Sequence, residues 1–304
     1  MAKSTGLIKL EGFLGGYTFY YRKGKPFVKS SSGHTKERMK TDPDFANVRK
    51  VNNEFGGASK ASKVVRDGLG KDLSLIAGKC NNQVTGLFQK VIANTEGDRG
   101  RRPVKFAAKK NLLQGFQFGK KAKVDIRIDK TVSATDKGIE ISWKAEKYHR
   151  SNLPAKSKAT HVRMVIAAIC VSDLVFNEKT EQYEPKNRLW HGKSKVSYSD
   201  YLPLDEEIGD KRYSLIIENS GQRNEGDAIV ICAGVIFYEE DRGHYYTVHT
   251  GSFAGIEDVI DVGDHDEKKE EFQTEDIRLT TKLGLDIIPL EGVNLRLDGK
   301  GDFG

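Results

Sequence analysis

The pattern of apolar and polar positions changes about a third of the way along the 304-residue chain. Between residues 43 and 93 apolar side chains recur every three or four positions, whereas beyond residue 123 they form short runs separated by turn residues. The first pattern predicts helices and the second predicts strands. The expected fold class is α+β: an N-terminal β-hairpin arm and a two-helix segment, then an antiparallel β-sandwich with an extended C-terminal tail.

The first thirty residues are rich in β-forming side chains and are interrupted by glycines. Residues 6–22 alternate imperfectly and break at Gly15-Gly16, and a second turn over residues 22–26 leads into a short third strand. Three strands alone are marginal in water. We therefore expect this arm, and the extended segment 277–304, to add a strand to the sheet of a neighbouring copy and to bury apolar side chains there.

A helix is predicted to begin at Asp42-Pro43, with aspartate as the N-cap and proline at the first helical position. It is expected to pack through Phe45, Val48, Val51 and Phe55, and its apolar stripe continues through Ala58, Ser62 and Val65. Glycines 56 and 57 interrupt the stripe, which indicates close packing or a kink. The sequence Gly68-Leu69-Gly70 ends this helix, and a second one is predicted through Leu73, Ile76, Cys80, Leu87 and Val91.

Beyond residue 110 the turn signals predict many strands and little helix, which favours a sandwich. Two runs, Val165–Val171 and Ala228–Phe237, are apolar throughout and predict strands buried on both faces. The expected strands are Lys123–Asp129, Gly138–Glu146, His161–Asp173, Val175–Asn177, Lys195–Ser199, Tyr213–Glu218, Asp227–Glu239 and His244–Thr250.

These elements suggest four regions. Residues 1–94 form a basic hairpin-plus-helices region, 95–110 a basic linker, 111–255 the β-sandwich domain, and 256–304 an acidic segment followed by the extended tail. The linker is polar, rich in glycine and closed by Pro103. The segment Glu257–Asp276 holds ten acidic residues and two lysines, and is expected to be a solvated acidic loop or helix.

Charge is divided along the chain. Residues 1–110 hold 23 Lys+Arg against 9 Asp+Glu, a net of +14, whereas residues 111–304 have a net charge of −7. A basic part of this kind binds either a polyanion or the acidic part of the next copy. The residues that could grip phosphates are Arg22, Lys23, Lys25, Arg99, Arg101, Arg102 and Lys105. The alternative for these residues is a solvated turn and a charged linker.

The N-terminal third carries several short motifs: Leu7 to Gly12, Gly16 to Tyr20, Asp42 to Ala46, Asn53 to Gly56 and Ala58 to Ala61. Through these motifs roughly the first 70 residues resemble an uncharacterised protein family of Bacteroidota that has no assigned activity. The resemblance implies a bacterial or phage-related source and says nothing about mechanism.

No motif for nucleotide, metal or nucleophilic chemistry is complete. Gly70-Lys71 is followed by Asp72, so the phosphate-binding loop fails, and no Gly-x-Ser-x-Gly elbow occurs. The seven histidines show no ligand spacing with the cysteines, and the acidic runs near residues 261–266 and 298–302 hold only fragments of a calcium loop. We therefore expect no enzyme activity, no cofactor, and no catalytic, cofactor-binding or metal-binding residue.

The location of the protein is predicted from three features. The N-terminus lacks the apolar region of a signal peptide, and the longest apolar run is too short to cross a bilayer. Cys80, Cys170 and Cys232 are widely spaced, and the last two lie in apolar runs, which favours buried free thiols. We therefore expect no membrane insertion, and a location in the cytoplasm or in a particle assembled there.

The leading hypothesis is a non-enzymatic structural protein that self-associates into a homo-oligomer, polymer or particle by exchanging strands through its terminal arms. An alternative is a nucleic-acid-associated protein with a basic N-terminal module. A third is a sandwich that binds carbohydrate or protein through Trp143, Trp190 and Tyr148. The residues expected to make self-association contacts are Leu10, Phe13, Tyr17, Phe19, Tyr21, Leu283, Leu285, Ile287 and Ile288.

Overall fold

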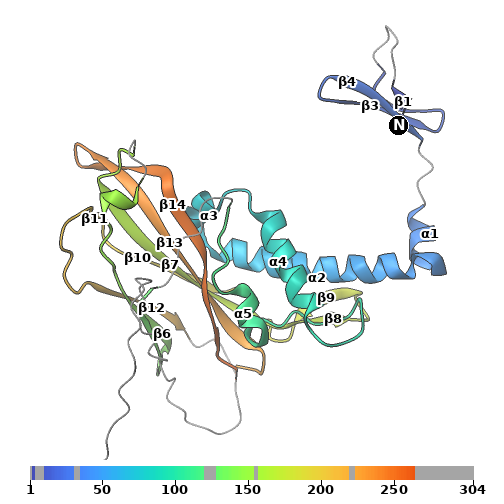
Figure 1. Cartoon of the computed structure of the whole chain (residues 1–304). Coiled ribbons are helices and arrows are strands. Elements are labelled where there is room, and N and C mark those ends of the chain that lie inside the picture. Colours follow the sequence, from blue (N-terminus) through green and yellow to red (C-terminus); the bar gives the residue numbers. More distant parts are fainter. Residues whose placement is uncertain are drawn as a thin grey trace, which may run out of the picture. The chain divides into compact units, whose positions relative to one another are not determined.

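The computed structural model is α+β, with helices and antiparallel sheets, as the sequence predicts (Figure 1). The structure describes residues 2–3, 10–30, 35–119, 128–153, 157–218 and 223–263. The predicted tail, including Leu283, Leu285, Ile287 and Ile288, lies outside the described residues.

The N-terminal residues form a small antiparallel sheet. Its strands are β2 (Gly12–Leu14), β3 (Tyr17–Arg22) and β4 (Lys25–Ser30), and β1 (Ala2–Lys3) adds a fourth to give the order β1-β4-β3-β2. Both hairpin turns have two central residues with positive φ: Gly15 and Gly16 in one, Lys23 and Gly24 in the other. Two positive φ values match the twist of the flanking strands, so the predicted hairpin with a third strand is confirmed.

The two predicted helices are present with two differences: α1 was not predicted, and the second helix is divided. α1 (Lys36–Thr41) and the short η1 (Pro43–Phe45) precede the long α2 (Ala46–Gly68). The predicted second helix is divided into α3 (Gly70–Ala77) and α4 (Asn81–Ala93), because Gly78 takes a φ of 60° and ends α3. Cys80 therefore precedes α4 instead of lying within a continuous helix.

Two antiparallel sheets make up the sandwich. The larger has the strand order β10-β7-β13-β14, with β11 also paired to β7, and the smaller has the order β12-β6-β5. A separate hairpin joins β8 to β9. The strands are β5 (Lys130–Thr135), β6 (Gly138–Lys144), β7 (His161–Ser172), β8 (Leu174–Asn177), β9 (Gln182–Pro185), β10 (Ser194–Tyr198), β11 (Leu202–Pro203), β12 (Arg212–Glu218), β13 (Asp227–Asp241) and β14 (His244–Asp261). The remaining short helices are η2 (Ala107–Lys109), α5 (Lys110–Leu113) and η3 (Arg150–Asn152).

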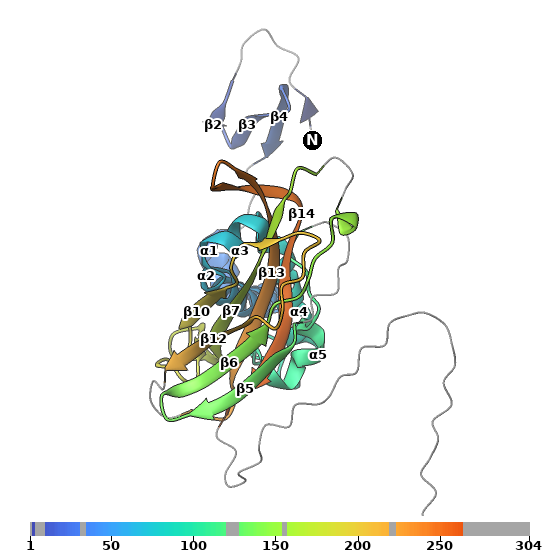
Figure 2. The ribbon, with the colours of Figure 1, turned by 90° about the vertical axis from the view of Figure 1, so that its left-hand side faces the viewer.

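Both apolar runs are strands buried on two faces, as predicted. The smaller sheet covers one face of β7 and β13, and the helices cover the other (Figure 2). Along β7, Met164 and Ile166 face the smaller sheet, whereas Val165 and Ala167 face the helices. Alternate side chains therefore enter two cores, which is why these strands have no polar face.

The helical layer approaches the sandwich through glycines. A Cβ on Gly57 would lie 2.9 Å from Cγ of Tyr183, and a Cβ on Gly68 would lie 2.6 Å from Cγ1 of Ile169. Real Cβ atoms do not approach so closely, so these two positions permit the contact of α2 with β9 and β7. The expectation that a glycine at 57 serves close packing is confirmed, whereas Gly56 faces open space.

Residues 102–106 form part of the helical layer and are not a free linker. Val104 and Phe106 are fully buried, and the Val104 amide donates to the Leu174 carbonyl at 2.9 Å. Phe106 packs edge-on against Phe88 of α4 with ring centroids 5.4 Å apart. The polar composition of residues 95–103 concealed this apolar pair, which joins the helices to β8 in a single core.

The N-terminal half of α2 does not pack as predicted. Val48, Val51 and Phe55 are 40%, 43% and 51% exposed, whereas Ala58 and Val65 are fully buried. The stripe is continuous in the sequence, but only its C-terminal half lies against the sandwich. The first half of α2 carries an uncovered apolar face.

The predicted strands differ from the observed ones in two respects. β5, β9 and β11 were not expected. The predicted strand Lys123–Asp129 falls mostly outside the described residues and stays a prediction. β14 continues from Thr250 to Asp261, so the start of the predicted solvated acidic segment is a strand. Glu257 within it is buried against a lysine, as described below.

Candidate interaction surfaces

The N-terminal sheet has no buried side chain among described residues 10–30. Of the residues predicted to self-associate, Leu10, Phe13 and Tyr17 are 45%, 69% and 52% exposed, and Phe19 and Tyr21 are half-buried. The structure therefore places four of these residues on one small sheet, and Leu10 lies two positions before β2. Leu14, which is not among the predicted residues, is 65% exposed on the same sheet.

Apolar side chains occupy both faces of this sheet. Tyr17, Phe19 and Tyr21 alternate along β3 and share one face, and Phe19 lies opposite Val28 of β4. Tyr20 lies on the other face and stacks on Phe27 with ring centroids 5.7 Å apart. A strand with apolar side chains on both faces is typical of a sheet covered on both sides.

One edge of this sheet is formed by β2. Among the described strands β2 pairs with β3 alone, through Gly12–Phe19, Phe13–Thr18 and Leu14–Tyr17. The outer edge of such a strand presents backbone groups that can pair with another chain. Phe13 and Leu14 project to opposite faces at this edge, so a strand added there would approach apolar groups on each face.

Basic residues lie at the β3–β4 turn of the sheet. Arg22, Lys23 and Lys25 are all exposed around this turn. They are the three N-terminal members of the predicted polyanion-binding set. Their proximity is compatible with binding phosphates and also with a solvated turn.

Of the other four members of that set, Arg99, Arg101 and Arg102 lie beside α2, and two of these three are paired with carboxylates. Arg102 donates from Nε and Nη2 to the two carboxylate oxygens of Glu54, each at 2.8 Å, and Arg101 pairs with Glu178 at 2.7 Å. The hydrogen bond to Glu54 raises the pKa of Arg102. Burial acts to raise the pKa of Glu54, but the bonds from Arg102 and the Gly100 amide outweigh it and hold the pKa below its usual value. Arg102 therefore fixes the segment after α4 to α2 and is not available to phosphates.

A broad groove of about 1010 Å³ runs beside the N-terminal half of α2. The exposed Arg99 lines it, whereas Lys105 does not. The charged residues that line it are Lys36, Lys40, Arg49, Lys50, Arg99 and Arg101 on the basic side, and Asp98, Glu178 and Glu181 on the acidic side. The groove is thus basic overall but carries carboxylates, which weakens its attraction for a polyanion.

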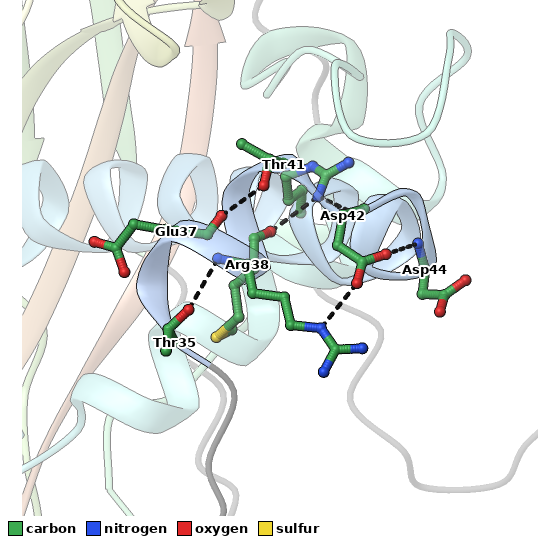
Figure 3. Close-up of polar contacts among 8 residues, drawn as sticks. Thr35, Glu37, Arg38, Thr41, Asp42 and Asp44 are labelled. Carbon is green, nitrogen blue, oxygen red and sulfur yellow. Dashed lines mark hydrogen bonds and ion pairs between the residues drawn. The ribbon is translucent and has the colours of Figure 1, made fainter.

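One wall of this groove is held by the corner between α1 and α2 (Figure 3). The hydroxyl of Thr35 accepts from the Arg38 amide at 3.2 Å and caps α1, and Arg38 Nε donates to Asp42 Oδ2 at 2.9 Å. The other carboxylate oxygen of Asp42 accepts from the Asp44 amide at 3.0 Å. Asp42 is therefore an N-cap as predicted, but it caps η1, and α2 begins only at Ala46. These bonds satisfy helix-end amides and fix the turn into α2.

The tryptophans do not form a ligand-stacking surface. Trp143 and Trp190 are each 2% exposed, and the Trp190 indole donates to the Ala228 carbonyl at 3.2 Å. Tyr148 packs edge-on against Phe237, and burial raises its pKa. The third hypothesis therefore loses the residues on which it rested, because Trp143 and Trp190 belong to the sandwich core and the partly buried Tyr148 packs against it.

The three cysteines are buried free thiols, as predicted. Burial raises the pKa of the Cys170 thiol to about 12, with a smaller opposing influence from Lys193. A thiol in this state is not a nucleophile at neutral pH. Among the described residues no group of three or more His, Cys, Asp or Glu side chains is placed to hold a metal ion.

A buried ionic cluster at the edges of the two sheets was not predicted from the sequence. Lys130 of β5 lies with Nζ 2.8 Å from the Glu257 carboxylate and 3.0 Å from Oδ2 of Asp258, both on β14. The side chains of Lys130, Glu257 and Asp258 are 14%, 7% and 23% exposed. Sequence reasoning missed it because Glu257 and Asp258 begin an acidic run, which is usually solvated.

Comparison with known proteins adds no assignment: no family model, curated protein or solved structure matches the chain. The resemblance of the first 70 residues to a Bacteroidota family therefore stays a prediction. Within the described residues, no helix is both long enough and apolar enough to span a bilayer.

Proposed function

We propose that this chain is a non-enzymatic structural subunit that self-associates into a polymer or particle through its N-terminal sheet. The observation that carries the proposal is the exposure of that sheet, which has apolar side chains on both faces and no buried side chain among residues 10–30. A second copy that covers either face, or adds a strand to β2, would supply the missing burial.

The expected energy of such a contact comes from a few side chains. Burying Phe13, Leu14 and Tyr17 would contribute roughly 1.5–3 kcal/mol each, by the usual value for large apolar side chains. Ordering the chain and losing free motion on association offset much of this gain. A contact with one neighbour is therefore weak, whereas repeated contacts in a lattice are strong.

The C-terminal segment 277–304 belongs to the same proposal on sequence grounds alone. It carries Leu283, Leu285, Ile287 and Ile288 and lies outside the described residues. The net charges of +14 and −7 favour contact between the basic part of one copy and the acidic part of another.

A pair of single substitutions tests the proposal. Phe13→Asp places a charge on the exposed edge of the N-terminal sheet, and Phe55→Asp places one at a comparably exposed aromatic on α2. Light scattering of both variants should show that Phe13→Asp disperses the assembly while Phe55→Asp leaves it intact. Equal assembly of the Phe13→Asp variant and the unchanged protein would refute a role for this edge.

A nucleic-acid-associated function is the second candidate. The basic side of the α2 groove and the cluster at Arg22, Lys23 and Lys25 favour it, whereas the Arg102–Glu54 pair and the groove carboxylates weigh against it. Titration of labelled single-stranded DNA at several salt concentrations tests this candidate. Binding that weakens steeply with salt and is lost in Lys50→Glu would support it. Absence of binding at low salt would exclude it.

A further inference from the structure

The ionic cluster at Lys130 owes its geometry to a β-bulge. Ile231 of β13 lies opposite Asp258 and the next residue, Cys232, lies opposite Ile256, so Glu257 is an extra residue in β14. In a regular strand Glu257 and Asp258 would point to opposite faces. The bulge re-aims them so that both carboxylates reach the same Lys130 ammonium, and bulges commonly re-aim side chains in this way.

We propose that Lys130 and Asp258 form an intramolecular isopeptide bond, with Glu257 as the acid–base residue that moves the protons. The bond would join the Lys130 Nζ to the Asp258 Cγ. It forms within one folded chain, so it does not depend on self-association.

The atoms needed for this reaction are in place. Lys130 Nζ lies 3.0 Å from Asp258 Oδ2, so the amine is held beside the carbon it would attack. Lys130 Nζ donates a hydrogen bond to Oε1 of Glu257 at 2.8 Å, and it lies 2.8 Å from Oε2 as well. Fixing reactants at such distances raises their effective concentration by many orders of magnitude.

The reaction balances without any co-reactant. The Lys130 ammonium gives one proton to the Glu257 carboxylate, Glu257 passes that proton to Oδ2 of Asp258, and the free amine attacks Cγ of the neutral acid. The new C–N bond forms and the Cγ–Oδ2 bond breaks. Oδ2 leaves as water, with the proton already received from Glu257 and one more from the attacking nitrogen. An ammonium and a carboxylate thus become an amide and water, and Glu257 ends as a carboxylate.

The surroundings assign different roles to the two carboxylates. Burial raises the pKa of Glu257 despite the opposing Lys130 charge, so this group accepts and returns a proton readily. Burial would also raise the pKa of Asp258, but the Lys130 charge and bonds from Lys130 and Gln114 lower it. Gln114 Nε2 donates to Oδ1 of Asp258, where negative charge develops during the attack. The raised pKa makes Glu257 the proton carrier. The Gln114 bond marks Asp258 as the electrophile, once a proton from Glu257 has neutralised its carboxylate.

The starting state is an ion pair. Burial tends to lower the pKa of Lys130, but the two carboxylates outweigh it and raise the pKa. The reaction must therefore begin with the proton transfer from Lys130 to Glu257, which replaces two buried charges by two neutral groups. A low-dielectric site favours that transfer more than water does.

The bond would join distant parts of the sandwich. Lys130 opens β5, the first strand of the smaller sheet, and Asp258 lies near the end of β14, the last described strand of the larger one. A covalent link there would close most of the sandwich into a single loop and resist its opening from either end.

Mass spectrometry of the full chain tests the proposal. The intact mass should be lower than the sequence mass by one water molecule, and tandem spectra of a digest should contain a branched peptide that joins Lys130 to Asp258. An intact mass equal to that of the sequence would overturn the proposal. Because an Asp-Gly step can also lose water by forming a ring, a mass deficit without the branched peptide would overturn it too.

Three variants complete the test. Lys130→Arg keeps the charge but should restore the full sequence mass, and Glu257→Gln should leave most molecules without the bond. Lys144→Arg is the matched control, because Lys144 also pairs with a carboxylate, Asp210 at 2.9 Å, but is 39% exposed. This control should keep the mass deficit. A mass deficit that persists in Lys130→Arg would contradict the assignment. If a variant does not fold, the mass spectra of the unchanged protein alone decide the case.

Discussion

Asp173, at the junction of β7 and β8, is a carboxylate almost wholly removed from water. It is 6% exposed, and its Oδ1 accepts a hydrogen bond from the Phe106 amide at 3.1 Å. Burial raises its pKa to about 6, although the Phe106 bond and nearby lysines act in the opposite direction. Asp173 ties the segment after α4 to the sandwich, and its protonation state should affect stability.

The direction of that effect follows from linkage. The folded protein holds the proton more tightly than the unfolded chain, so the stabilisation from Asp173 is full below about pH 3.8 and is lost as pH rises to about 6. The Asn variant cannot titrate but can still accept from the Phe106 amide. The free energy of unfolding of the unchanged protein, relative to Asp173→Asn, should fall by ~2–3 kcal/mol across this window. Urea unfolding at pH values on both sides of the window measures this difference, and a constant difference would contradict the assignment.

Two phenylalanines, one exposed and one buried, test which apolar side chains belong to the core. Phe55 is 51% exposed and Phe106 is fully buried. Phe106→Ala should lower the free energy of unfolding by about 3–5 kcal/mol, as for other core aromatics, whereas Phe55→Ala should change it by less than ~0.5 kcal/mol. Thermal or urea unfolding of both variants tests this placement. A large decrease in the free energy of unfolding for Phe55→Ala would mean that the N-terminal half of α2 is covered in the protein as purified.

At the scale of elements, α2 shows how adjacent glycines differ. A Cβ at Gly56 would meet nothing within 4 Å, whereas a Cβ at Gly57 would lie 2.9 Å from the Tyr183 ring. The Tyr183 hydroxyl donates to the Arg102 carbonyl at 2.9 Å, which holds that ring in place. The two positions therefore provide a matched pair within one helix.

Alanine at these positions should have opposite effects. Gly56→Ala should stabilise the protein by roughly 0.5–1 kcal/mol, because alanine is the better helix former. Gly57→Ala should destabilise it by about 1–3 kcal/mol, because the added methyl group forces Tyr183 to shift. Urea unfolding of the two variants gives the comparison. Stabilisation by both substitutions would show that α2 does not approach β9 as described.

The sequence predicts the helices and strands better than it predicts which of their faces are buried. The cap at Asp42 and the 3.6-residue period are local, so the sequence predicts α2 well, and the doubly apolar runs predict β7 and β13. The period shows that Val48, Val51 and Phe55 share a face, but only the tertiary structure shows that this face is not covered. Likewise β5 lacks a clear apolar alternation, and its register depends on pairing with β6.

At the scale of the whole molecule, the described residues from α2 to β14 form three layers: helices, the larger sheet and the smaller sheet. The sequence predicts the sandwich but does not predict that helices cover the other face of its larger sheet. The composition of residues 95–110 is that of a linker, which suggested that the helices are separate from the sandwich. Two buried residues there, Val104 and Phe106, give no periodic signal. The candidate surfaces differ in the same way. The N-terminal sheet was predicted from residues that are close in the sequence. The Lys130 cluster was not predicted, because its residues are distant in the sequence.

Self-association through the N-terminal sheet is the central claim, and deletion of residues 1–30 tests it most directly. The measurement is the molar mass of the full chain and of the truncated chain by light scattering at matched concentrations. The layers from α2 to β14 have their own cores, so the truncated chain should stay folded, as circular dichroism would show. We predict a folded truncated monomer beside a full chain of much larger mass. A folded truncated chain that assembles as the full chain does, or a full chain that is monomeric at all concentrations, would contradict the account.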